Sequence, residues 1–117
     1  METFDKVKII VKALDSKKAH NIKVVKIDDL TILGDYFVFA NGNSSTQVRS
    51  LADEIDEKMS ESGIEPGHIE GKASGWILLD YGDVVVHVFG REEREFYSLE
   101  KLWQDAEEID ISDIISE

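Results

Sequence analysis

The sequence predicts an α/β (α+β) domain with a single mixed β-sheet and helices packed mainly on one face of that sheet. Three observations lead to this prediction. Some segments place apolar residues at helical spacing, others are short and rich in β-branched and aromatic residues, and the two kinds alternate along the chain. The predicted order of elements is α-β-β-α-β-β-β-α.

The first predicted helix covers about residues 2–15, and its apolar stripe consists of Phe4, Val7, Ile10, Val11 and Leu14. A strand follows at residues 21–28, and a loop containing Gly34 leads to a second strand at residues 36–41. This second strand is apolar on both faces, so we expect it to lie inside the sheet.

Ser44 and Gln47 match a capping box, which predicts that a helix begins here. The run Gly-Asn-Ser-Ser-Thr at 42–46 could instead cradle a phosphate, but it lacks the lysine and the spacing of a P-loop. The predicted helix ends near Gly63, and its apolar face consists of Val48, Leu51, Ala52, Ile55 and Met59. A short strand is expected at residues 68–70.

A β-hairpin is predicted at residues 75–89, with Gly82 and Asp83 as a two-residue turn. This turn pairs Trp76 with Phe89 and divides the side chains between two faces. The first face is almost wholly aliphatic and suits helix packing: Ile77, Leu79, Tyr81, Val84, Val86 and Val88. The second, which we call the mixed face, carries Trp76, Leu78, Asp80, Val85, His87 and Phe89.

The mixed face has two interpretations. Aromatic anchors with a few polar groups are typical of a surface that recognises a partner. Alternatively, the hairpin is core and Asp80 and His87 find partners inside the protein, because unpaired polar burial is costly. A three-residue turn at 81–83 would move one whole strand to the other face.

A third helix is predicted after Glu92 and Glu93, with an apolar stripe of Phe96, Leu99 and Trp103. Residues 104–117 hold six acids and no base. We therefore expect one domain at residues 1–104 and an acidic C-terminal tail at residues 105–117, either mobile or a frayed helix. The isoleucines at 109, 111, 114 and 115 could give this tail a weak docking face.

The formal net charge is −12, and it is unevenly distributed. Residues 1–27 hold seven lysines against three acids, so the rest of the chain is strongly acidic. An acidic body repels phosphate backbones, so we expect no DNA binding and favour a basic protein partner. The alternative is that acidity only keeps the protein soluble.

The sequence has no cysteine, which excludes disulfides and thiolate metal sites and is compatible with the cytoplasm. Its first residues are charged and do not resemble a signal peptide. No window approaches the roughly 18 apolar residues that span a membrane. We therefore expect a cytoplasmic protein without membrane contact.

A search for catalytic and metal-binding patterns finds none that is complete. A nucleotidyltransferase needs two acids one residue apart on the strand after its Gly-Ser turn, to hold magnesium. Neither His68-Ile-Glu nor Leu78-Leu-Asp has that spacing. His68 and Glu70 share a strand face, but a third metal ligand is not evident. We expect no enzyme activity, no cofactor and no metal.

Three blocks resemble the ribosomal silencing factor family, also called RsfS or Iojap: DYFVFANGNSSTQV at 35–48, GWILLDYGDVVVHVF at 75–89 and REFYSLEKLW at 94–103. They occur in the family's order and spacing. The matching positions are Trp76, Asp80, Gly82, Asp83, His87, Val88, Arg94, Tyr97, Leu99, Glu100, Leu102 and Trp103. The acidic tail departs from the pattern.

The resemblance implies a nucleotidyltransferase-like fold without the catalytic residues. It also implies a protein that binds ribosomal protein L-fourteen on the large ribosomal subunit, blocks association with the small subunit and represses translation when nutrients are short. Family members are often homodimers. On this basis we expect the partner contacts to be Trp76, Leu78, Asp80, Val85, His87, Phe89 and Tyr97.

Two other functions stay open at this point. One is a nucleotide-binding or nucleotidyltransferase enzyme with unorthodox ligands. The other is a scaffold for large-subunit assembly that docks on the same subunit.

Overall fold

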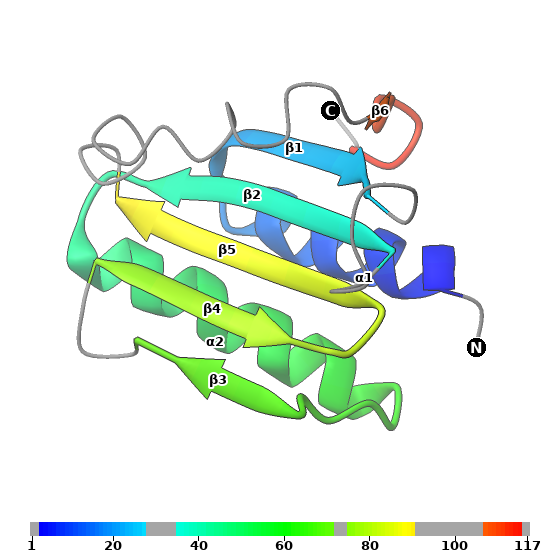
Figure 1. The fold of residues 1–117 in the computed structure, drawn as a ribbon. Helices are drawn as coiled ribbons and strands as arrows, with labels where there is room; N and C mark the ends of the chain where they lie inside the picture. The colour runs from blue at the N-terminus through cyan, green and yellow to red at the C-terminus, as the bar shows by residue number, and fades with distance from the viewer. Residues whose placement is uncertain (1–2, 28–34, 72–74, 91–106, 116–117) are drawn as a thin grey trace.

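A computed structural model describes residues 3–27, 35–71, 75–90 and 107–115. These residues form one six-stranded mixed sheet in the order β3-β4-β5-β2-β1-β6. Helices α1 and α2 lie side by side on one face of the sheet (Figure 1). The predicted fold class, a single mixed sheet with helices on one face, is confirmed.

The elements follow the predicted order up to the hairpin: α1 Thr3–Ser16, β1 His20–Lys26, β2 Tyr36–Gly42, α2 Ser45–Glu61, β3 His68–Glu70, β4 Trp76–Asp80, β5 Val84–Gly90 and β6 Glu107–Ile109. β2 and β5 run parallel at the centre, and the other neighbouring strands are antiparallel. The central position of β2 explains why its sequence is apolar on both faces.

The capping box at the start of α2 is confirmed. The Ser44 hydroxyl accepts a hydrogen bond from the Gln47 backbone N–H at 3.1 Å, and the Gln47 side-chain oxygen accepts one from the Asn43 N–H. The Gln47 amide also donates to the carbonyls of Lys17 and Lys18, both at 3.4 Å. The cap therefore also joins the start of α2 to the end of α1.

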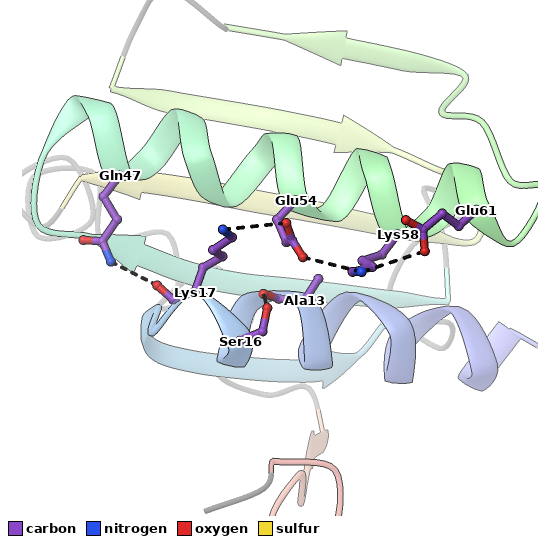
Figure 2. Close-up of polar contacts among 7 residues, drawn as sticks. All are labelled: Ala13, Ser16, Lys17, Gln47, Glu54, Lys58 and Glu61. Atoms are coloured by element: carbon purple, nitrogen blue, oxygen red, sulfur yellow. Dashed lines mark hydrogen bonds and ion pairs between the residues drawn. The ribbon is translucent and has the colours of Figure 1, made fainter.

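A second set of polar contacts lies along α2, and its Lys17–Glu54 pair joins α2 to the residue that follows α1 (Figure 2). The two carboxylate oxygens of Glu54 lie 4.0 Å from the amines of Lys17 and Lys58. Lys58 also pairs with Glu61 at 3.8 Å. Ion pairs near the surface are each worth less than about 1 kcal/mol. The helices are therefore held on the sheet mainly by the apolar side chains buried between them and the sheet.

The hairpin has the predicted register. Trp76 pairs with Phe89, Leu78 with His87, and the Tyr81 N–H donates to the Val84 carbonyl at 2.9 Å. The two-residue turn is thus correct, and the three-residue alternative is wrong. Gly82 adopts a φ of +88°, which disfavours any residue with a Cβ.

Asp83, the second turn residue, joins three elements. Its carboxylate accepts hydrogen bonds from Thr3 at 2.7 Å and from Lys6 at 2.8 Å, both on α1. Its carbonyl accepts from the N–H groups of Asp35 and Tyr36, where β2 begins. Burial alone would raise the pKa of Asp83, but the hydrogen bonds from Lys6 and Thr3 and the charge of Lys6 outweigh it and hold the pKa below its usual value.

The C-terminal region differs from the predicted mobile tail or frayed helix. Residues 107–109 form the edge strand β6, in which Ile109 pairs with Val24 of β1. Ile114 is only 8% exposed, and Ile109, Ile111 and Ile115 pack against the same core, so the expected isoleucine docking face is present. The predicted third helix, with Phe96, Leu99 and Trp103, lies outside the described residues.

Candidate partner-binding face

The mixed face lies on the side of the sheet opposite to α1 and α2. A compact apolar cluster covers its centre, consisting of Val25, Ile27, Phe37, Phe39, Val85 and Phe89, with Trp76 and Leu78 packed against it. The helix-facing cluster is separate and contains the aliphatic side of the hairpin. The sheet thus has one face for folding against helices and another with a different, aromatic composition.

The predicted contact residues divide by strand. On β4, Trp76, Leu78 and Asp80 are half-buried, whereas the intervening residues are buried. On β5, exposure falls to 6% for Val85, 7% for His87 and 0% for Phe89. β5 lies at the centre of the sheet, and β4 lies next to the short edge strand β3. Tyr97 lies outside the described residues.

His87 is surrounded by aromatic rings. Its ring centroid lies 5.0 Å from that of Phe37, and it stacks on Phe39 at 5.3 Å with an interplanar angle of 19°. The indole N–H of Trp76 donates to Nδ1 of His87 at 3.3 Å. Because Nδ1 accepts, the neutral ring carries its proton on Nε2.

Burial lowers the pKa of His87 from 6.5 to about 4. The imidazole is therefore neutral at physiological pH. Within the described part of the chain, Nε2 of His87 is buried and has no hydrogen-bond partner. Among these residues, the hydrogen bond to the His87 imidazole is the one that Trp76 donates to Nδ1.

Asp80 has an internal role as well as a partly exposed position. Its Oδ1 accepts from the Gly82 N–H at 2.8 Å, which supports the turn. In the sheet it lies opposite His68 of β3. The side chain of His68 in turn contacts Glu70 at 2.7 Å on the exposed end of that strand.

Sequence reasoning missed the contribution of Phe37 and Phe39 to this face. The two residues are two positions apart on β2, so their side chains share one face of the sheet. The side chains beside them depend on the parallel pairing of β2 with β5, which sets Phe39 opposite His87. The sequence shows this spacing of the phenylalanines within residues 36–41, which indicates a shared face. It does not indicate which strand pairs with β2. Among the residues that the structure describes, no group of three or more His, Cys, Asp or Glu side chains is placed to hold a metal ion.

None of the helices in the described ranges combines the length and apolar composition needed to cross a membrane. The candidate site is a sheet surface: a half-buried row of Trp76, Leu78 and Asp80 beside a buried cluster that contains three phenylalanines.

Comparison with known proteins agrees with the resemblance noted from the motifs. Residues 1–117 match a family model described as ribosomal silencing factor during starvation. The chain is 38% identical over 117 residues to the ribosomal silencing factor RsfS of Halalkalibacterium halodurans, covering 99% of this chain and 100% of that one. It is 44% identical over 100 residues to that of Bacillus subtilis, covering 85% of each.

A solved structure has the same fold. The crystal structure of a Chromobacterium violaceum protein superposes with a TM-score of 0.87 at 35% identity, covering 89% of this chain and 88% of that one. The fold and these relatives define a class of small single-sheet proteins named for silencing the ribosome. The chain belongs to the ribosomal silencing factor family.

Proposed function

We propose that this protein binds ribosomal protein L-fourteen on the large ribosomal subunit, blocks association with the small subunit and thereby represses translation. Membership of the family and the names of its relatives support this proposal. The mechanism needs no catalysis, because a ligand on one face of the large subunit competes with the small subunit by mass action. The protein acts in the cytoplasm as a binding protein, not an enzyme, and forms a homodimer away from the ribosome.

One observation carries the choice of surface. Trp76, Leu78 and Asp80 form a half-buried row on β4, beside a layer of buried aromatic side chains. Tryptophan is a frequent binding anchor, and an anchor that is already ordered loses less entropy when the partner binds. Val85, His87 and Phe89 are buried, so they support this row from β5. Tyr97 completes the proposed contact set.

Charge supports a basic protein partner. The net charge of −12 favours encounter with a positively charged ribosomal protein and disfavours contact with the phosphates of ribosomal RNA. Charge complementarity of this kind sets orientation and association rate more than final affinity.

The decisive experiment replaces Trp76 by alanine. Loss of a central aromatic anchor typically costs about 2 kcal/mol or more, which is roughly a thirtyfold loss of affinity. We expect Trp76→Ala to bind L-fourteen weakly in titration calorimetry and to leave the subunits joined in sucrose gradients. Wild type should increase the fraction of separate subunits.

Lys12→Ala is the matched control, because Lys12 is exposed on α1, on the other side of the sheet. This variant should behave as wild type. Circular dichroism should show that both variants are folded. A folded Trp76→Ala that still separates the subunits would contradict the docking surface. Wild type that binds the large subunit without separating the subunits would point to an assembly scaffold instead.

A further inference from the structure

Trp76 does not reach the mixed face as an isolated side chain. Its indole N–H donates to Nδ1 of His87 at 3.3 Å, and its ring lies 6.1 Å from that of His87 and 6.3 Å from that of Phe89. The half-buried tryptophan therefore has both a directional bond and ring contacts to β5. A hydrogen bond donated to a buried acceptor selects one ring orientation among the rotamers of a tryptophan side chain.

His87 is well placed to provide that bond because it is itself immobilised. It is 7% exposed, stacks on Phe39 at 5.3 Å and contacts Phe37 at 5.0 Å. The backbone pairing of β2 with β5 sets Phe39 directly beside His87. Side chains of β2 therefore hold the imidazole of His87 on β5, and the imidazole holds the indole of Trp76 on β4.

We propose that His87 is the positioning residue of the docking face: its Nδ1 accepts the indole N–H of Trp76 and holds that ring in the orientation that the partner meets. The link to docking rests on the proposed function, whereas the link to the Trp76 orientation does not. His87 itself is buried and does not touch the partner.

Two variants separate this role from simple filling of the core. His87→Phe keeps an aromatic ring between the same neighbours but removes the acceptor. His87→Asn removes the ring but keeps an oxygen close to the position of Nδ1. A positioning role predicts that the acceptor matters, whereas a filling role predicts that the ring matters.

The first measurement is the indole N–H signal in ¹H–¹⁵N spectra of the full chain. The chain has two tryptophans, so the Trp76 signal is assigned as the one missing from Trp76→Phe. We expect His87→Phe to shift this signal upfield and to speed its exchange with solvent. His87→Asn should keep it closer to wild type. An unchanged Trp76 signal in folded His87→Phe would overturn the proposal.

The wild-type protein provides a test that does not depend on folding of any variant. The ¹⁵N shifts of the His87 ring distinguish the nitrogen that carries the proton from the one that does not. We expect the proton on Nε2 and an unprotonated Nδ1, whose lone pair accepts from Trp76. A proton on Nδ1 would overturn the proposal, since that nitrogen could not then accept from Trp76.

The second measurement is affinity for L-fourteen by calorimetry. One hydrogen bond is worth about 1 kcal/mol, so His87→Phe should bind roughly fivefold to tenfold more weakly than wild type. His87→Asn, which keeps an acceptor, should lose less affinity for L-fourteen than His87→Phe does. Wild-type affinity in a folded His87→Phe would overturn the positioning role in docking. If wild type itself does not bind L-fourteen, the proposed function fails, and the Trp76 signal still decides whether His87 orients the indole.

Discussion

At the scale of single residues, two buried polar side chains on opposite faces of the hairpin have opposite consequences. His87, on the mixed face, accepts a hydrogen bond through Nδ1. Tyr81 faces the helices, is 6% exposed, and its hydroxyl has no hydrogen-bond partner among the described residues. Burial, together with the carboxylates of Asp56 and Glu65, raises the pKa of Tyr81. The first group orients a neighbour, and the second only lowers stability.

Tyr81→Phe should therefore stabilise the protein. The substitution keeps the ring and removes a buried hydroxyl whose desolvation is not compensated, which should raise the free energy of unfolding by about 1 kcal/mol. Urea denaturation checks this value. Val84→Ala, which removes apolar bulk from a fully buried neighbour, is the control and should lower the free energy of unfolding. A less stable Tyr81→Phe would show that the hydroxyl has a partner in the native protein.

Acid should weaken the protein through His87. Its pKa falls from 6.5 in the unfolded chain to about 4 in the folded protein, so the folded state favours the neutral ring. The associated stability is fully present above pH 6.5 and is lost as the pH falls towards 4, by up to about 3 kcal/mol. The measurement is the free energy of unfolding at several pH values in wild type and His87→Phe. The variant should show a shallower loss between pH 6.5 and 4; parallel curves would contradict the assigned cause.

At the scale of elements, the turn of the hairpin is a junction. Asp83 binds Thr3 and Lys6 of α1 through its carboxylate and the start of β2 through its carbonyl. The helix is thus held at its N-terminus to the turn that presents β4 and β5. The sequence showed Asp83 as a turn residue, but its second role depends on where α1 packs.

Asp83→Asn should lower the free energy of unfolding by about 1 kcal/mol at neutral pH, because it removes a partly buried charge-assisted bond to Lys6. The folded-state pKa of Asp83 is lowered, so this stabilisation is present above the unfolded pKa and is lost as the pH falls through the folded one. A double-mutant cycle with Lys6→Met measures the coupling. Additive effects of the two substitutions would show that the ion pair contributes nothing.

The C-terminal segment is the second feature of this scale. β6 covers the edge of β1, and Ile114 is buried against the helix-facing core. The isoleucines at 109, 111, 114 and 115 indicated a docking face, but not that residues 107–109 pair with β1 as a strand.

Ile114→Ala should therefore cost about 2 kcal/mol of unfolding free energy, the lower end for a buried isoleucine. Asp113→Ala, at the exposed neighbouring position, should change stability by less than about 0.5 kcal/mol. Thermal or urea denaturation of both variants makes the comparison. Equal and negligible effects would restore the view of a mobile tail.

At the scale of the whole molecule, the two faces of the sheet carry two separate apolar clusters. The helices cover one face and form most of the core, while the mixed face carries the proposed anchor row. A substitution such as Trp76→Ala can therefore impair binding with the helix-facing core intact.

Local patterns determined much of this protein. Helical spacing defined α1 and α2, the Ser44–Gln47 box defined where α2 begins, and Gly82-Asp83 defined the hairpin register. The motifs pointed to the family. These features depend on residues close together in the chain, where backbone geometry and side-chain periodicity act directly.

Only the tertiary structure decided that the mixed-face residues of β4 are half-buried while those of β5 are buried. It also decided which side chains surround Trp76. Burial of His87 depends on the parallel pairing of β2 with β5, which brings Phe37 and Phe39 beside it from a distant part of the chain. The docking of β6 on β1 is equally long-range. Such pairings are chosen by the total area buried when the whole chain packs, and no local pattern encodes that sum.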